Sequence, residues 1–226
     1  MSGLFVDVWH GDLLLNQSEE SYYWSLLNDD EKQKADKFTR PELQNKYVKT
    51  RGVLRQILAS YLDVEPKYID IKIGGYGKPY LAEDSVSFNL SHTGNKFVLA
   101  VGNVGDMGID LELHRDRMNM SGLVEKCFSD EESVYWHSLP EMHKTQMFFR
   151  FWVRKEAFVK AVGRGIALGL EHCVVDPDSQ QFFLNIPVTY GLASDWKILD
   201  IQLKQEDICA LVTNNVEFDY TPRKIS

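Results

Sequence analysis

The feature that most constrains the fold is an order of elements that occurs twice along the chain. In each half, charged and then amphipathic helical segments precede a pair of apolar strands joined by a short turn. The second strands of these pairs lie in the similar sequences KFVLAVGN and DICALVTN. The repeat predicts an α+β fold with two similar halves, residues 1–104 and 105–226, related by a pseudo-twofold axis. Each half would pack helices on a small antiparallel sheet, with a cleft between the halves.

Hydrophobic periodicity and turn residues place the individual elements. In the first half they predict a strand at 4–9, helices over 29–61, a turn around 74–79, strands at 86–92 and 97–103 joined by a turn at 93–95, and a strand around 107–113. In the second half they predict a helical region at 129–139, a long helix from about 144 to 162, and strands at 196–203 and 208–214.

Bulk composition is that of a soluble globular protein, with 226 residues of which 44% are hydrophobic and 26% charged. No apolar run approaches the roughly 20 residues needed to cross a bilayer. The first residues do not resemble a signal peptide, and three scattered cysteines do not form a disulfide framework or a zinc motif. The net charge of -8 argues against general nucleic-acid binding. We therefore expect a cytoplasmic protein without membrane or nucleic-acid partners.

Charge is unevenly distributed, because residues 31–55 hold eight basic residues against three acidic ones. For most of the eight, a solvated helix face is the ordinary explanation. Where they gather, a local basic surface on an acidic protein suits a small polyanion or an acidic protein partner. The eight are Lys32, Lys34, Lys37, Arg40, Lys46, Lys49, Arg51 and Arg55.

Two acids in the strand sequence GIDLE are the first candidates for chemistry. Asp110 and Glu112 are two residues apart, so their side chains project from the same face of the strand. Two like charges between apolar residues are unfavourable without a cation. An exposed edge strand would also tolerate them, and His114 could extend them to a transition-metal site, although no second histidine stands at ligand spacing.

A third acid lies in the sequence WVRKEAFVK of the long helix. Glu156 and Lys160 are one turn apart and share an arc with Phe149, Trp152 and Val153. Charges on an apolar arc are costly unless they are paired or bound to a metal. An isolated pair of this kind is usually structural, but the acidic strand pair favours a site. Three carboxylates and a lysine can hold a hard divalent cation against phosphate oxygens, which indicates phosphoryl chemistry.

Three further motifs are weaker. Ser91 and His92 end a strand and can donate hydrogen bonds to phosphate, whereas the glycines of a serine-hydrolase elbow are missing. The GGYGKP sequence lacks the Walker pattern, although Lys78 within it could contact phosphate or simply be solvated. Ser129 and Glu132 form the capping box of a helix.

Taken in order, GKP, FNLSHT, GIDLE, FS-x-x-E and W-x-x-KEA-x-x-K resemble the motifs of the 4'-phosphopantetheinyl transferases. The resemblance is to the long, surfactin-type (Sfp-type) pseudo-dimeric class, and it runs from about residue 34 to 165. It implies an enzyme whose active site lies in the cleft between two similar halves. Any single motif is weak, whereas five in register are specific.

The resemblance implies a role for each matching residue. It implies that Mg2+, or Mn2+, is bound by Asp110, Glu112 and Glu156 and holds the pyrophosphate of coenzyme A. The implied catalytic residues are Glu156, Lys160 and His92. The implied coenzyme A contacts are Lys46 and Arg51 for the 3'-phosphate, Ser91 and His92 for the phosphates, Lys78 and Pro79 at the adenine, and Lys155 and Lys160. Glu132 would be supporting, and Lys46 stands where arginine is common in the family.

The implied reaction moves the phosphopantetheine arm of coenzyme A to a serine of an apo acyl or peptidyl carrier protein and releases 3',5'-ADP. We expect a monomer, because duplicated halves already supply a paired interface. Met118, Met120 and Leu123 could dock the carrier helix, since methionines suit adaptable contacts. Two alternatives remain open: an inactive coenzyme A-binding scaffold, and a Mg2+-dependent nuclease or phosphohydrolase, which the acidic charge disfavours.

Overall fold

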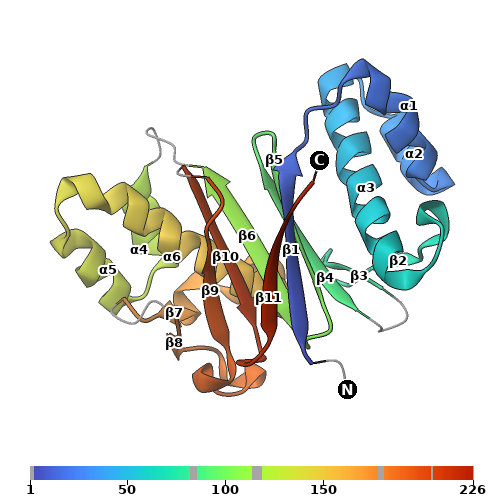
Figure 1. Ribbon diagram of the computed structural model, residues 1–226. Coiled ribbons are helices and arrows are strands. Elements are labelled where there is room, and N and C mark those ends of the chain that lie inside the picture. The colour runs from blue at the N-terminus through green and yellow to red at the C-terminus, as the bar shows by residue number, and fades with distance from the viewer. Residues whose placement is uncertain (1–2, 82–85, 114–118, 178–180, 205, 226) are drawn as a thin grey trace.

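Two sheets form the middle of the molecule, and helices cover their outer sides (Figure 1). The computed structural model describes residues 3–81, 86–113, 119–177, 181–204 and 206–225. One sheet has the strand order β11-β1-β5-β4 and the other the order β6-β10-β9, while β2 with β3 and β7 with β8 form small separate hairpins. Among the described strands, the pairing of β1 with β11 is parallel and the others are antiparallel.

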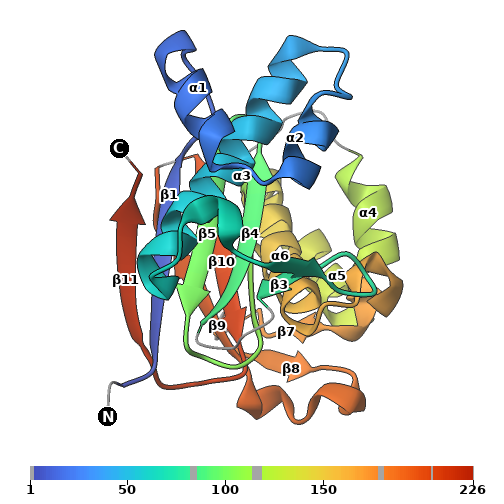
Figure 2. The same ribbon diagram turned by 90° about the vertical axis from the view of Figure 1, so that its right-hand side faces the viewer.

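The strands and helices have the following bounds. The strands are β1 (Phe5–Asp12), β2 (Ile71–Ile73), β3 (Pro79–Leu81), β4 (Ser87–Thr93), β5 (Lys96–Gly102), β6 (Met107–Leu113), β7 (Val174–Val175), β8 (Phe183–Asn185), β9 (Lys197–Ile201), β10 (Asp207–Thr213) and β11 (Asp219–Lys224). The helices are α1 (Gln17–Leu26), α2 (Asp29–Ala35), α3 (Pro41–Leu62), α4 (Met120–Cys127), α5 (Asp130–Ser138) and α6 (Glu141–Val162). Figure 2 shows helices α1–α3 beside the β4–β5 side of the first sheet.

Three apolar clusters hold these layers together. The first lies between helices α1–α3 and one face of the first sheet, and the second joins α4–α6 to the second sheet. The third lies between the sheets, where Val8 and Val98 of the first sheet meet Ile109, Leu111 and Leu211 of the second. Burial of these side chains is the main force that fixes the two sheets against each other.

A polar seam joins the two sheets where β4 runs beside β6. Side chains at alternate positions of β4 point the same way, and here these are Ser87, Asn89, Ser91 and Thr93. No ladder of hydrogen bonds links β4 to β6 in the described sheets. Instead the Ile109 amide donates to Asn89 Oδ1 at 2.9 Å. The polar face of β4 is therefore turned toward the acidic strand, not toward solvent.

The helices expected over 29–61 are α2 and α3, which are separate because Pro41 starts α3 and has no amide to continue a helix from α2. The long helix begins at Glu141, earlier than expected, and the predicted 93–95 turn has two residues, Gly94 and Asn95. Strands β4, β5, β6, β9 and β10 lie where the periodicity placed them, within a few residues. In the described part of the chain, no helix is long and apolar enough to cross a membrane.

Candidate active site

The carboxylate of Asp110 connects three elements: β6, β4 and α6. Its Oδ1 atom accepts a hydrogen bond from the Ser91 hydroxyl at 2.8 Å and one from the Lys160 ammonium at 2.6 Å. Lys160 also donates to Ser91 Oγ at 2.8 Å and to the carbonyl of Ile109 at 3.3 Å. Asp110 is only 6% exposed. A buried carboxylate of the second sheet is thus linked to a strand of the first sheet and to the long helix.

Glu112 follows on the same face of β6 and meets the next polar residue of β4. Its Oε2 atom accepts a hydrogen bond from Thr93 Oγ1 at 3.1 Å. The steps from Ser91 to Thr93 and from Asp110 to Glu112 match because both strands have a side-chain period of two. Each predicted strand acid therefore has a hydroxyl of β4 beside it.

Glu156 of α6 completes the acidic group. Burial raises the pKa of the Glu156 carboxyl above its ordinary value, and the charges of Asp110 and Glu112 raise it further. The Lys160 ammonium, one turn along the helix, opposes that rise. The structure thus brings the three predicted acids within electrostatic reach of one another, together with the predicted lysine.

A divalent cation fits the chemistry of this group. Asp110 Oδ2 is buried and has no hydrogen-bond partner among the described residues. Carboxylate oxygens are the ligands that Mg2+ prefers, and a cation would relieve the repulsion that raises the pKa of Glu156. As the side chains lie, however, no three acidic, histidine or cysteine residues of the described ranges are close enough together to hold a metal ion. The positive charge beside Asp110 is that of Lys160.

Comparison with known proteins places both halves of the chain. A family model described as the 4'-phosphopantetheinyl transferase superfamily matches residues 106–212, and one described as 4'-phosphopantetheinyl transferase, N-terminal, matches residues 16–104. The 4'-phosphopantetheinyl transferase HetI of Nostoc sp. is 33% identical over 222 residues, which cover 96% of this chain and 90% of HetI. The chain belongs to the 4'-phosphopantetheinyl transferases.

The 4'-phosphopantetheinyl transferase Sfp of Bacillus subtilis is 24% identical over 161 residues, covering 71% of this chain and 70% of Sfp. AcpT of Escherichia coli K12 is 36% identical over 110 residues, covering 48% of this chain and 55% of AcpT. These similarities support assignment to the Sfp-type class.

In this transferase, Lys46 of α3 reaches the turn of the β4–β5 hairpin, near His92 of β4. The Lys46 ammonium donates to the carbonyl of Gly94 at 2.5 Å, and His92 is exposed. Partial burial and the charges of Lys46 and Lys160 lower the pKa of His92. The two residues are near each other and accessible, as a contact with a phosphate group requires.

Arg51 is engaged elsewhere, in the helical layer of the transferase. Its Nε donates to Glu31 Oε1 at 2.6 Å, while Arg55 Nε donates to Glu31 Oε2 at 2.5 Å. Lys49 pairs with Glu19 at 2.8 Å. Three of the eight basic residues at 31–55 are therefore in ion pairs among helices α1–α3. The local basic surface predicted from the sequence thus contains fewer unpaired positive charges than the eight residues suggest.

The prediction that Lys155 contacts coenzyme A does not fit its surroundings. The Lys155 and Glu132 side chains are both 0% exposed and form an ion pair at 2.5 Å. Lys155 also donates to the carbonyl of Leu170 at 3.0 Å, and Glu132 accepts from the Val175 amide at 2.8 Å. A side chain so enclosed cannot touch a ligand, so this pair holds α6 against α5 and β7.

Ser91 and Lys78 are likewise turned inward. The Ser91 hydroxyl donates to Asp110 and accepts from the Lys160 ammonium, and its predicted contact with phosphate stays a prediction. The Lys78 ammonium donates to the carbonyls of Met107 and Ala161. Pro79 begins β3 beside it and is half-buried.

Thr93 and Asn89 lie beside the acids and were not predicted as members of this site. The signal was present, since SFNLSHT alternates polar residues at 87, 89, 91 and 93 with Phe88, Leu90 and His92. That alternation predicts one polar face of the strand. Such a face is interpreted as solvent-exposed unless another polar strand is known to lie against it. His114 and Met118 lie outside the described residues.

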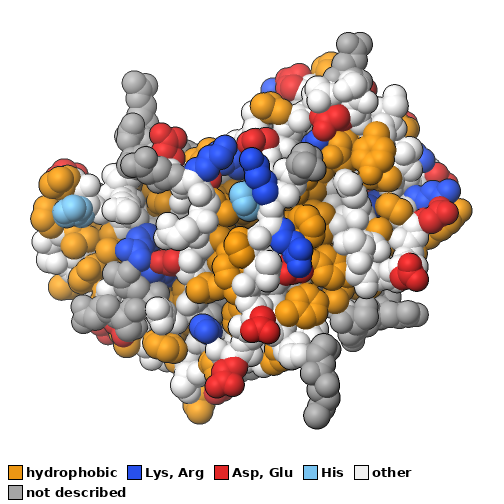
Figure 3. Space-filling view, in the orientation of Figure 1, with side chains coloured by type: hydrophobic (Ala, Val, Ile, Leu, Met, Phe, Trp, Pro, Cys, Tyr) orange, Lys and Arg blue, Asp and Glu red, His pale blue; other side chains and the backbone are white. Residues whose placement is uncertain are grey.

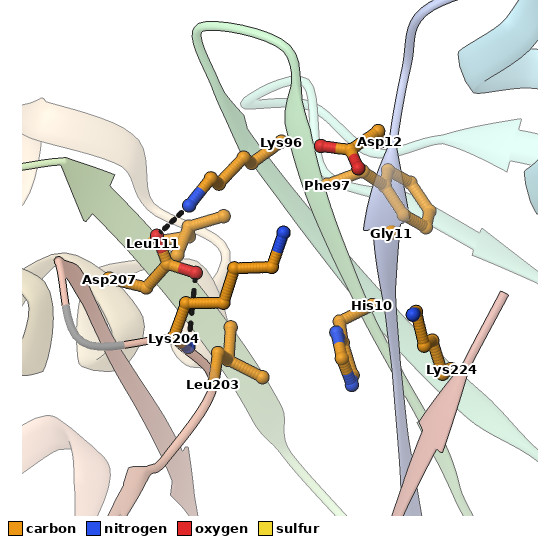
Figure 4. Close-up of a pocket in the computed structure, with 10 residues that line it drawn as sticks. All are labelled: His10, Gly11, Asp12, Lys96, Phe97, Leu111, Leu203, Lys204, Asp207 and Lys224. Carbon is orange, nitrogen blue, oxygen red and sulfur yellow. Dashed lines mark hydrogen bonds and ion pairs between the residues drawn. The ribbon is translucent and has the colours of Figure 1, made fainter.

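A separate hollow lies on the other side of β6, where basic side chains gather in the upper middle of the face in Figure 3. Figure 4 shows its lining, with Leu111, Lys96 and Lys204 toward one side and His10 and Lys224 toward the other. Two carboxylates, Asp12 and Asp207, also line it, and Asp207 accepts bonds from the Lys96 ammonium and the Lys204 amide. Its two carboxylates offset two of the three lysine charges. Because Leu111 alternates with the acids on β6, this hollow is not the candidate active site.

Proposed function

We propose that this transferase moves the 4'-phosphopantetheine arm of coenzyme A to a serine of an apo acyl or peptidyl carrier protein and releases 3',5'-ADP. The main support for this proposal is a hydrogen-bonded cluster formed by Lys160 of α6, Asp110 of β6 and Ser91 of β4. The carboxylates of Glu112 and Glu156 lie beside it. Membership in the family does not by itself decide the role of any residue in the site. It gives no support to the alternative of a nuclease.

The three acids would hold Mg2+ (or Mn2+), which supplies positive charge to the pyrophosphate of coenzyme A. Asp110 offers its unpartnered buried Oδ2 atom, and Ser91 and Thr93 hold the two strand acids in place. Binding of a cation among them would lower the raised pKa of Glu156. This metal site is proposed because carboxylate oxygens are suitable Mg2+ ligands and because the three acids repel one another. The distances between the side chains in the structure do not enter into the proposal.

The remaining steps belong to protein groups. The carrier serine oxygen forms a bond to the phosphorus next to pantetheine, and the anhydride oxygen leaves with 3',5'-ADP. Glu156 accepts the serine proton, directly or through water, and Lys160 neutralises charge that develops on the pyrophosphate. Lys46 and His92 bind nucleotide phosphate near the turn of the β4–β5 hairpin. Positioning and charge supply most of the acceleration in such reactions.

We also propose that the two halves of the chain are related by pseudo-twofold symmetry. Helices α3 and α6, each 22 residues long, would correspond across a pseudo-twofold axis, with the site in a cleft between residues 1–104 and 105–226. Contacts of β4 with β6 support a site shared between the halves. A single chain that contains both halves would act as a monomer in the cytoplasm.

Intact-mass spectrometry tests the activity directly. An apo carrier protein incubated with coenzyme A, Mg2+ and this transferase should gain the mass of one phosphopantetheine. A chelator should abolish the gain, and excess Mg2+ should restore it. Several carriers that all stay unmodified, although coenzyme A binds to the protein, would contradict the proposed function.

Carrier docking gives a second expectation. Met120 and Leu123 of α4 are half-buried against the second core cluster, so part of each remains at the surface. Replacing both with Asp should raise the carrier KM by about 10-fold and leave the Kd for coenzyme A unchanged, since truncated interface anchors typically cost about 1–2 kcal/mol. Steady-state kinetics and calorimetry measure the two effects. The exposed Val134→Asp variant on α5 is the control, and an unchanged carrier KM would reject α4 as the docking helix.

A further inference from the structure

Lys78 reaches from a loop of the first half to the two elements that carry the acids. It follows the β2–β3 turn, in which the Gly77 amide donates to the carbonyl of Gly74 at 2.9 Å and Gly77 has a φ of +88°. The turn directs the Lys78 side chain across to β6 and α6. Its Nζ donates to the carbonyl of Met107 at 3.1 Å and to that of Ala161 at 2.6 Å.

Each carbonyl that Lys78 binds lies at the end of its element. Met107 is the first residue of β6, and Ala161 lies in the last turn of α6. Carbonyls in the last turn of a helix have no partner within the helix, and a cation there also interacts favourably with the helix dipole. Lys78 therefore supplies a hydrogen bond and a charge that the end of α6 requires.

The two elements approach each other closely at Gly108, the residue that follows Met107. A Cβ atom on Gly108 would lie 2.1 Å from the Ala157 carbonyl oxygen and 2.4 Å from the Ala161 nitrogen. Only a glycine allows this approach of β6 to α6. Lys160 bonds to Asp110 and Ile109 on one side of the contact, and Lys78 spans the other side.

We propose that Lys78 is a positioning residue that fixes the separation of β6 and α6, and with it the spacing of the strand acids Asp110 and Glu112 from Glu156 of the helix. The inference rests on the proposed function, and it assigns to Lys78 a role other than contact with the nucleotide. Burial among backbone groups, which lowers the pKa of Lys78, accords with an ammonium that is enclosed by protein.

Lys78→Met tests the proposal, because it keeps the side-chain stem and removes the ammonium. Loss of the bridge should weaken Mn2+ binding, followed by the free-ion spin-resonance signal, by about 10-fold, as is usual when a supporting partner of a metal site is removed. The kcat should fall by a similar factor, while the Kd for coenzyme A measured without metal stays within about twofold. Lys78→Arg should restore most of the loss, since a guanidinium can also donate to two carbonyls.

Lys72→Met is the matched control, since Lys72 lies on the same hairpin with its side chain 52% exposed and paired with Asp70. Amide hydrogen exchange gives a readout that does not depend on activity. Exchange of Val162 and Gly163, in the last turn and cap of α6, should quicken in Lys78→Met and not in Lys72→Met. This result is expected whether or not the protein modifies any carrier, so failure of this inference and failure of the proposed function are distinguishable.

The opposite pattern overturns the proposal. A weaker coenzyme A affinity in Lys78→Met, with unchanged Mn2+ binding and unchanged exchange, would make Lys78 a ligand contact. If Lys78→Met does not fold, the wild-type protein decides the question. The Lys78 ammonium should give a protected NMR signal that keeps its position when coenzyme A is added, and a shift as large as that of Lys46 would refute the inference.

Discussion

Glu156→Gln should lower the rate of phosphopantetheine transfer by about 10^2- to 10^3-fold, which is the usual effect of removing one charged group that stabilises a transition state. The amide has the shape of the carboxylate but neither its charge nor its basicity. It would therefore weaken both the proposed cation site and the acceptance of the serine proton. Single-turnover transfer to a carrier protein measures the rate, and Glu42→Gln, an exposed change on α3, is the matched control.

The same substitution should leave the metal-free protein at least as stable to heat. Burial and the charges of Asp110 and Glu112 all disfavour the ionised form of Glu156, which is what its raised pKa expresses. A neutral amide at this position removes that cost, while Lys160 keeps its partner in Asp110. Stability gained together with activity lost is typical of a residue retained for function. A variant with lower thermal stability and normal transfer would refute both parts of this expectation.

Lys155→Met should destabilise the folded protein by about 3–5 kcal/mol, because it leaves the carboxylate of Glu132 buried without a counter-charge. Glu132 would still accept hydrogen bonds from the Ser129 and Val175 amides, but no positive charge would balance it. Urea unfolding followed by circular dichroism measures the loss. Lys67→Met, which breaks an exposed pair with Glu65, should change stability by less than about 1 kcal/mol.

The double variant Lys155→Met with Glu132→Gln tests whether the unpaired charge of Glu132 causes the loss of stability. Neutralising both partners removes the buried charge, and the single side-chain oxygen of the glutamine can still accept one of the two backbone hydrogen bonds that Glu132 accepts. Part of the stability lost in Lys155→Met should therefore return in the double variant. Equal or greater loss in the double variant would show that the ion pair is not the source of the effect.

The sequence predicts secondary structure and site residues well where a residue pattern is compatible with a single structure. The apolar alternation around 107–113 predicts β6 at its observed bounds, and a long apolar run with Glu156 and Lys160 predicts a buried helix that carries charge. Asp110, Glu112 and Glu156 could be predicted as site residues because charges among apolar residues need partners. The structure adds the contacts of Lys160, Ser91 and Asp110 that such a requirement anticipates.

Elements without such a pattern were not predicted. Helix α1 starts with an Asn16–Glu19 capping box and buries Tyr23, but most of its other residues are at least partly exposed. Strand β11 is exposed along nearly its whole length and contains Pro222, which is tolerated because the strand lies at a sheet edge. Neither segment has the periodicity from which a helix or strand is inferred.

Residue roles were least accessible where they depend on what lies opposite in space. Lys78, Lys155 and Arg51 were all interpreted as ligand contacts, because a lysine or arginine in a motif gives no information about its partners. In the structure the three bind backbone carbonyls, a buried carboxylate and Glu31 respectively. These partners are 20 to 83 residues away along the chain.

The parallel pairing of β1 with β11 has a consequence for how the chain reaches its native state. Register runs from Phe5 with Asp219 to His10 with Lys224, so one edge of the earliest strand is covered by residues from the other end of the chain. During synthesis that edge of β1 stays unpaired until β11 has emerged from the ribosome. Contacts of such large sequence separation form slowly, and an uncovered strand edge can pair with another molecule in the meantime. The first half of the chain can thus collapse early, but completion of its sheet must wait for the last strand.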